Sequence, residues 1–415
     1  MQQFTTTEEF IYRGRPLSGI PLLVDKDEYP VSPFTNYMMH LALERGRITS
    51  DKTLKSHADA LYDYFSWLRA NGLTWDREPK RTPGGKEISN LSLYQNWSKN
   101  SYRKPDGTEL KNTTINLRTS RIEAFYRWAK DIAGLIDWLP FITKIVAVSQ
   151  GHPDALAHTH GQRVVESSES RLPTFKVFPK LLNVDQVREL HNAPMSKTIK
   201  LAISLILATG LRNVEARSFP RKYIFDPRGR DPRKRIRIDL DPNDIELKNS
   251  KPRTVYVSWQ LMMEMHQYVQ AGEGAERGNI YRNREGTLPT MLLLNHLGKP
   301  FADKGLNDAL RALYKGKTKN GKFHPPVISF RTAPHMLRHT FATLELYAES
   351  EAIDKKTGRK RGLGHALGWV RDRLGHSNIQ TTTIYVHCLQ QMETPELNEW
   401  QETLSEMLGE GTRGA

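Results

Sequence analysis

The segment from Leu201 to Ala208, LAISLILA, is apolar on nearly every side when it is drawn as a helix. Such a helix has no face suited to water, so other elements must surround it. A Gly-Leu-Arg sequence follows at once and places the charged guanidinium of Arg212 at the edge of this buried region. A buried charge is unfavourable unless an opposite charge compensates it. We therefore expect the chain to fold around this helix, with an anion or an internal acid beside Arg212.

Apolar periodicity divides the rest of the chain into a helical first part and a mixed second part. Apolar residues recur at steps of three and four over residues 54–68 and 112–132, which is typical of amphipathic helices. Asn183 and Gln186 resemble a capping box at a helix start. Three short alternating stretches separated by turn residues predict strands at 235–240, 245–249 and 253–258. The fold class expected is mainly α with a small antiparallel β-sheet.

A chain of 415 residues favours two to three domains. The expected regions are an irregular N-terminal arm at 1–30, a helical domain at 31–148, a polar interdomain linker at 149–180, the main domain at 181–395 and a C-terminal helix or tail at 396–415. The tail carries an apolar stripe, which must bury either against its own domain or against another protomer.

The charge balance makes nucleic acid the leading partner. Lys and Arg number 61 against 46 Asp and Glu, which gives a net charge of +15, and neutralising phosphates releases condensed counterions. The only cysteine, Cys388, excludes an internal disulfide framework and a Cys-based zinc ribbon. The sequence contains no apolar run of about 18 residues, so no membrane span is expected. The N-terminus lacks the pattern of a secretory signal. We expect an intracellular, reducing compartment.

Four short motifs could carry chemistry, although each has an ordinary alternative. Arg212 is followed by Glu215 three residues on, which could simply be an internal ion pair. A basic turn holds Lys248, Lys251 and Arg253, and most basic turns are merely solvated.

His335 and Arg338, three residues apart, share one face of a predicted helix, and His339 lies one turn from His335. A zinc-protease motif would need Glu directly after the first His, where this chain has Met336. The fourth motif is a Leu-Gly-His turn that presents His376, with Tyr385 nine residues later.

Together and in this order, the motifs resemble the tyrosine recombinase (phage integrase) family, whose active site is Arg, Lys, His-x-x-Arg, His or Trp, then Tyr. The matching catalytic residues are Arg212, Lys248, His335, Arg338, His376 and Tyr385. Glu215 and His339 are expected to support them. Lys248 is preferred to Lys251 because it lies five residues before the hairpin arginine, as in the family. The resemblance covers residues 181–395, and residues 349–364 look like an inserted loop.

The resemblance implies a helical core-binding (SAM-like) DNA-binding domain over 31–148 and an α+β catalytic domain. DNA contacts are expected from Lys111, Arg118, Arg121, Lys251 and Arg253. It also implies a covalent 3′-phosphotyrosine, a four-way junction and a tetramer on two duplexes, assembled from monomers in solution. The long chain, large N-terminal domain and inserted loop favour a mobile-element integrase in the bacterial cytoplasm, at the nucleoid. Accessory DNA-bending proteins would fit this interpretation.

The chemistry of the residues agrees with this interpretation. Two guanidiniums can hold phosphate oxygens where negative charge develops, so no cofactor or metal is expected. Tyr385 would be the nucleophile, His335 its base and Lys248 the acid for the leaving 5′ oxygen, with His376 bound to the phosphate. Two alternatives remain open, a type IB topoisomerase-like relaxation of DNA and a non-catalytic DNA-binding protein on the same fold.

Overall fold

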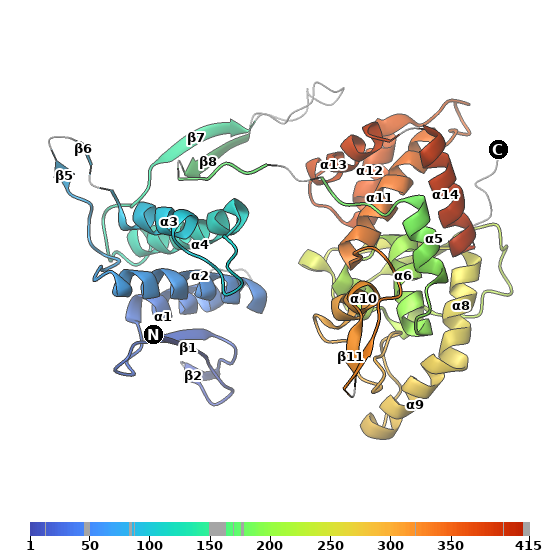
Figure 1. The fold of residues 1–415 in the computed structure, drawn as a ribbon, viewed down its shortest axis with the longest axis horizontal. Helices are drawn as coiled ribbons and strands as arrows, with labels where there is room; N and C mark the ends of the chain where they lie inside the picture. Colours follow the sequence, from blue (N-terminus) through green and yellow to red (C-terminus); the bar gives the residue numbers. More distant parts are fainter. Residues whose placement is uncertain are drawn as a thin grey trace. The chain divides into compact units, whose positions relative to one another are not determined.

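The protein is described from a computed structural model. The structure describes residues 1–12, 14–44, 50–82, 85–86, 88–148, 163–168, 170–175, 178–319, 321–392 and 394–409. The chain forms two compact units, unit 1 over residues 1–176 and unit 2 over residues 177–415 (Figure 1). Within the described ranges, no helix has the length and apolar character needed to cross a membrane.

Unit 1 is built on amphipathic helices whose apolar faces meet in one core. They are α1 (Ser32–Met39), which continues into a π-helical turn (His40–Glu44), α2 (Asp51–Ala70), α3 (Asn90–Asn100) and α4 (Asn112–Asp131). Ser50 caps α2 by accepting a hydrogen bond from the backbone N–H of Thr53 at 3.3 Å. Leu61 of α2 and Phe125 of α4 are fully buried in the shared core. Both helices predicted from periodicity are confirmed.

The first 30 residues have more regular structure than the irregular arm expected from the sequence. Strand β1 (Gln2–Thr5) pairs antiparallel with β4 (Pro21–Val24), and β2 (Ile11–Tyr12) pairs with β3 (Arg15–Pro16). Leu23 and Ile20 are buried against the helices of unit 1. The physical reason is the alternate burial along β4, which joins the strand pair to the core.

The expected linker at 149–180 differs from the structure in one part. Residues 149–162 lie outside the described residues, whereas β8 (Arg163–Ser168) pairs antiparallel with β7 (Thr143–Val148). The β-branched residues Ile145, Val146, Val164 and Val165 favour this extended pairing. A further short pair in unit 1 joins β5 (Arg81–Thr82) to β6 (Gly85–Lys86).

Unit 2 surrounds the apolar helix α6 (Lys197–Thr209), whose residues from Leu201 onward are all buried. The capping box of Asn183 and Gln186 forms at the start of α5, as predicted. The other helices are α5 (Val184–Asn192), α7 (Asn213–Arg217), α8 (Trp259–Gln270), α9 (Glu273–Glu285), α10 (Gly305–Lys315), α11 (Pro334–Glu351), α12 (Gly362–Leu374), α13 (Gln380–Gln390) and α14 (Thr394–Leu408), with 3-10 turns at Arg221–Tyr223 and Lys248–Ser250.

The sheet of unit 2 is smaller than expected. Strand β9 (Ile236–Leu240) pairs antiparallel with β10 (Arg253–Val257), and β11 (Lys317–Lys319) pairs with β12 (Lys322–His324). The third strand expected at 245–249 does not form, because Ile245 and Leu247 bury directly in the helical core without a partner strand. The mainly α class with small antiparallel sheets is confirmed.

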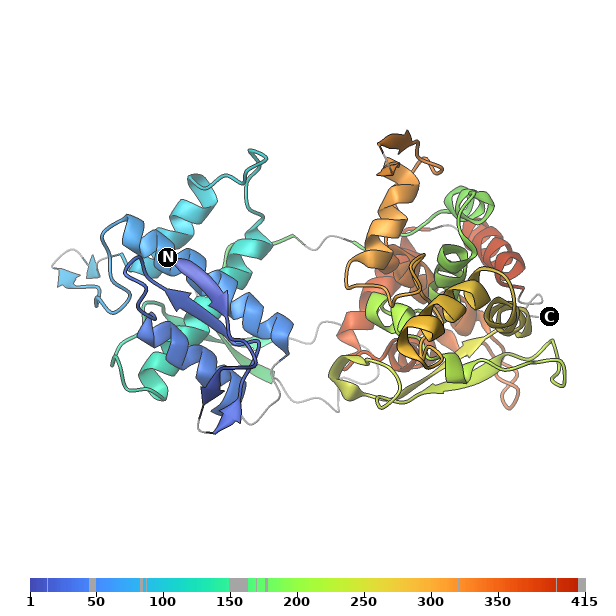
Figure 2. The same ribbon diagram turned by 90° about the horizontal axis from the view of Figure 1, so that it is seen from below.

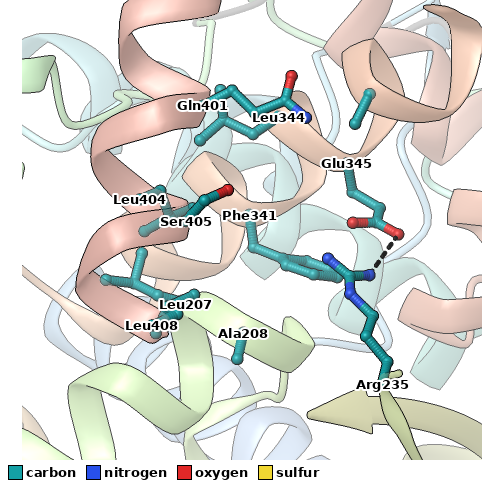
Figure 3. Close-up of a pocket in the computed structure, with 11 residues that line it drawn as sticks. Leu207, Ala208, Arg235, Phe341, Leu344, Glu345, Gln401, Leu404, Ser405 and Leu408 are labelled. Carbon is teal, nitrogen blue, oxygen red and sulfur yellow. Dashed lines mark hydrogen bonds and ion pairs between the residues drawn. The ribbon is translucent and has the colours of Figure 1, made fainter. Parts of the chain in front are cut away.

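Helix α14 buries its apolar stripe within its own unit. Leu397, Trp400, Leu404 and Leu408 belong to the core that surrounds α6. Figure 3 shows Leu404 and Leu408 facing Leu207 of α6. The carbonyl of Leu408 accepts a hydrogen bond from Ser258 Oγ at 2.6 Å. Of the two alternatives left open for this stripe, the structure shows packing on its own domain.

Candidate active site

The candidate site lies where the α6–α7 turn, the start of α11, the end of α12 and helix α13 come together. Gly210 ends α6 in the left-handed region with φ +66°, and a Cβ there would collide with Phe341 and Leu374. This position therefore favours glycine twice, through its backbone conformation and through the close approach of α11 and α12. The turn delivers Arg212 directly beside both helices.

A buried carboxylate holds Arg212 in place. Glu215 is fully buried and accepts hydrogen bonds from Arg212, from the backbone N–H at 2.6 Å and from Nη1 at 3.0 Å. Arg253 Nη1 also donates to Glu215 at 2.8 Å. Burial alone would raise the pKa of Glu215, but Arg253 and Arg212 lower it to about 2. The carboxylate therefore stays charged, and Arg212 keeps Nη2 directed to the carbonyl of Gly375 at 3.3 Å.

The basic turn between β9 and β10 is split between the interior and the surface. Arg253 is buried, and a Cβ at Gly375 would lie 3.1 Å from its Cδ. This placement differs from the DNA contact expected for Arg253, because the guanidinium is needed to neutralise Glu215. Lys248 and Lys251 are exposed on the connecting loop, where Ser250 takes φ 48°. Exposure therefore does not distinguish the two lysines, and Lys248 remains preferred to Lys251 as the candidate acid.

Arg338 occupies the centre of the site. It is 3% exposed and donates to the carbonyl of Leu374 at 2.8 Å, to the carbonyl of Gly210, and to His376 Nε2 at 3.2 Å. Burial, followed by the charge of Arg212, lowers the pKa of Arg338 to about 9, which leaves it protonated at neutral pH. The guanidinium of Arg338 thus links α11 to two segments that are distant in sequence, the turn at Gly210 and the turn from Leu374 to His376.

The contacts of His376 define its tautomer. A guanidinium has no acceptor, so His376 Nε2 must accept from Arg338 and the ring proton must sit on Nδ1. That proton is then donated to Thr382 Oγ1, which lies 3.0 Å away. Burial, then the charges of Arg338 and Arg212, lower the pKa of His376 to about 3. The imidazole is therefore neutral and is held between two helices.

Tyr385 lies inside the site with its hydroxyl on a histidine. Its side chain is 2% exposed, and Oη lies 3.0 Å from His339 Nδ1. Its ring stacks on His376 with the centroids 6.5 Å apart. Burial raises the pKa of Tyr385 although Arg338 opposes it, so the phenol is protonated at neutral pH.

The histidine nearest to the phenol is not the one expected as the base. His335 is exposed on the first turn of α11 and stacks on His339 with the centroids 6.0 Å apart. Burial, followed by the charges of His335 and Arg338, lowers the pKa of His339 to about 4. A neutral His339 with its proton on Nε2 can accept the hydrogen of Tyr385. The helical spacing predicted that His335 and His339 lie together but could not tell which one touches the tyrosine.

The remaining predicted DNA contacts belong to unit 1. Lys111 is exposed at the start of α4, and Arg121 is half-buried. Arg118 Nη1 lies 2.7 Å from Asp63 Oδ2 and is largely shielded from solvent. Its charge is therefore already compensated, which differs from the free phosphate contact expected for it.

Sequence reasoning missed Thr382 and the three carbonyls that orient the arginines, at Gly210, Leu374 and Gly375. Thr382 lies in a largely polar run, residues 377–383, that precedes Tyr385. Backbone carbonyls leave no residue-type signal at all, apart from the two glycines. In the described part of the chain, no group of three or more His, Cys, Asp or Glu residues could hold a metal ion.

The two depressed histidine pKa values predict acid sensitivity of the fold. His339 and His376 have pKa values of about 4 and about 3 in the folded chain, against about 6.5 when unfolded. Between these pH values the unfolded chain binds more protons than the folded chain. The contribution of the two histidines to the free energy of unfolding should therefore be complete above pH 6.5 and should decrease as the pH drops toward 4. Urea denaturation at pH 7.5 and pH 5 measures this. His376→Asn should show a smaller loss, and an equal loss in both proteins would contradict the assignment.

Comparison with known proteins identifies a family match in unit 2. Residues 178–355 match the model of the phage integrase family. The tyrosine recombinase XerC of Lactobacillus delbrueckii subsp. bulgaricus is 24% identical over 320 residues, which is 76% of this chain and 84% of that protein. Transposase A from transposon Tn554 of Staphylococcus aureus is 28% identical over 230 residues, covering 54% of this chain and 53% of that protein.

Among solved structures, the integrase of transposon Tn1549 in complex with a circular intermediate DNA aligns with a TM-score of 0.51 at 15% identity, over 87% of this chain and 98% of that chain. This likeness concerns the fold. The family match falls on the unit that holds the candidate site, and the XerC alignment extends over most of both chains. Residues 178–355 thus carry a domain of the phage integrase family, and the comparisons support a tyrosine-type site-specific DNA recombinase.

Proposed function

We propose that the chain cuts and rejoins DNA strands through a covalent 3′-phosphotyrosine on Tyr385. The observation that supports this most strongly is that two guanidiniums, Arg212 and Arg338, lie in one site with a neutral imidazole and the buried phenol of Tyr385. A phosphodiester is an anion, and attack on it increases the charge of its non-bridging oxygens. Arg212 and Arg338 would hold those oxygens with fixed donors, and electrostatic stabilisation of this kind commonly contributes most to the rate enhancement of an enzyme.

The proposed step transfers the phosphoryl group from the 5′ oxygen of the DNA to Tyr385 Oη. Tyr385 Oη attacks phosphorus, a bond from phosphorus to Oη forms, and the bond to the 5′ oxygen breaks. The phenol proton passes to an imidazole, and the 5′ oxygen takes a proton from Lys248, with Lys251 as the alternative. Because a phosphodiester is exchanged for another phosphodiester, the reverse step can rejoin strands without ATP. The guanidiniums supply the positive charge, so the proposal includes no metal ion.

Two histidines are candidates for the proton acceptor. His339 contacts Tyr385 Oη in the structure, whereas His335 is exposed beside it. We propose that His339 is the immediate partner of the phenol and that His335 faces the phosphate of the incoming DNA. Thr382, through His376, would keep Arg338 oriented until DNA arrives.

The biological setting proposed is a mobile-element integrase that works at the nucleoid of a bacterial cell. Two of the proteins named above, transposase A of Tn554 and the integrase of Tn1549, come from transposons, which supports a mobile element. Exchange between two duplexes requires four strand cuts, so we propose a tetramer on DNA assembled from monomers. Lys111 and Lys251 are exposed cations that would contact DNA, and DNA-bending proteins are possible partners.

The test is incubation with nicked duplexes made from repeats found beside the coding region, where release of a short fragment traps the intermediate. A covalent adduct that survives denaturing electrophoresis is expected. Binding should also weaken steeply with salt. DNA binding without any adduct would support a non-catalytic protein, and relaxation of supercoiled plasmid without strand exchange would support the topoisomerase-like alternative.

A further inference from the structure

The β11–β12 hairpin of unit 2 has no role in the site described above. It follows α10 directly and extends beyond the neighbouring helices (Figure 2). Its register pairs Lys317 with His324 and Thr318 with Phe323. Because side chains alternate along a strand, Lys317, Lys322 and His324 share one face of the hairpin, and all three are exposed.

The sequence around this hairpin carries charges of a single sign, and the acid Glu189 from α5 contacts the interval only at Ser329, beyond the hairpin. The sequence contains no Asp or Glu between Asp308 and Glu345. The cations in that interval are Arg311, Lys315, Lys317, Lys319, Lys322, Arg331 and Arg338. Like charges close together on one face of a strand pair are destabilising. A face of this kind is therefore better suited to a polyanion than to water alone.

The part of the inserted loop (349–364) that lies between α11 and α12, residues 352–361, is also basic but differs in this respect. Lys360 Nζ lies 2.5 Å from Glu351 Oε2, and Arg361 pairs with Glu349. Asp354 accepts hydrogen bonds from the loop backbone at Lys356 and Thr357. Acids within the loop and beside it thus offset part of its charge, whereas the hairpin has no such acids in its sequence interval.

The base of the hairpin is fixed on the helical body. The backbone N–H groups of Val327 and Ile328 donate to the carbonyl of Leu313 at 2.7 and 3.1 Å, and Ile328 is buried. Gly316 opens the hairpin with φ +69°, and a Cβ there would collide with the carbonyl of His324. A fixed base means that little conformational entropy is lost when the exposed face binds a ligand.

The base of the hairpin is close enough to the candidate site for one duplex to reach both. Ile328 precedes His335 by seven residues, so their Cα atoms are at most about 24 Å apart, at about 3.4 Å per residue. One turn of duplex DNA spans about 34 Å. A duplex whose phosphate meets Arg338 would therefore be long enough, within one turn, to carry phosphates to the base of the hairpin.

We propose that the basic face of the β11–β12 hairpin binds the phosphate backbone of duplex DNA beside the cleavage point, through Lys317 and Lys322. This inference rests on the proposed function, because the distance argument assumes DNA at Arg338. The contact adds affinity without reading bases, since phosphates carry no sequence information.

The test compares the salt dependence of duplex binding among three double variants, measured by fluorescence anisotropy between about 50 and 200 mM salt. In Lys317→Gln/Lys322→Gln, the slope of log affinity against log salt should decrease by about 0.9 for each lysine removed. Lys317→Arg/Lys322→Arg keeps the charge and should keep the slope. Lys355→Gln/Lys356→Gln removes the same charge from exposed positions of the inserted loop and should change the slope much less.

Three outcomes would overturn the inference. The first is a wild-type slope in the hairpin glutamine variant, and the second is an equal change in the inserted-loop variant, which would indicate a general effect of net charge. The third is an unchanged slope with loss of complexes that hold two duplexes, which would indicate a protein partner. Failure of the proposed function is detected separately on the same DNA, as absence of a covalent adduct from the wild type, because the slope measures binding and not cleavage.

Discussion

Tyr385→Phe should abolish the covalent protein–DNA adduct and leave duplex affinity nearly unchanged. The substitution removes the attacking oxygen but keeps the ring, which is 2% exposed and stacks on His376. The hydrogen bond to His339 is lost, and such a loss changes stability by about 1 kcal/mol. The measurement is adduct formation on the nicked duplex, with binding of the same duplex followed by anisotropy.

Tyr347→Phe is the matched control for this experiment. Tyr347 lies on α11 and also donates its hydroxyl to one partner, Asn398 Oδ1, at 2.7 Å. It lies outside the contacts that link Arg338, His376 and Tyr385, so its variant should form the adduct at the wild-type rate. A normal adduct yield from Tyr385→Phe would show that another group is the nucleophile.

Arg338→Lys should slow strand cleavage by roughly 10²–10³-fold, the range seen when one fixed donor to a developing oxyanion is removed. Arg338 binds the carbonyls of Gly210 and Leu374 and the imidazole of His376 simultaneously. A lysine has one ammonium on a flexible stem and cannot reproduce a planar set of donors. Single-turnover adduct formation measures the rate, and thermal unfolding reports on folding.

Arg371→Lys is the corresponding control on α12. Arg371 is partly exposed and pairs with the neighbouring Asp372 at 2.7 Å, so the same substitution should leave the cleavage rate close to that of the wild type. If a folded Arg338→Lys protein cleaved within about tenfold of the wild type, this arginine would not be the main electrostatic donor.

The sequence was sufficient for features that depend on neighbouring residues. Helical periodicity predicted the helices around Leu61 and Phe125, and the cap at Asn183 was visible in its own tetrapeptide. The same local logic failed at 245–249, because alternation records burial and does not say whether a partner strand or a helical core covers the residue. At 1–30 the pairing of β1 with β4 spans a long loop, which short-range periodicity does not detect.

The order of chemical groups along the chain was readable as one site, from Arg212 to Tyr385, because their types and spacing resemble a known motif. Their contacts were not readable. Arg212 reaches the carbonyl of Gly375 across 163 positions, and Arg253 turns inward to Glu215 across 38. The choice of His339 over His335 as the neighbour of the phenol likewise follows from how α11 packs on α13. Side-chain chemistry is a local property of a sequence, whereas partners, burial and pKa values are set by segments that meet through space.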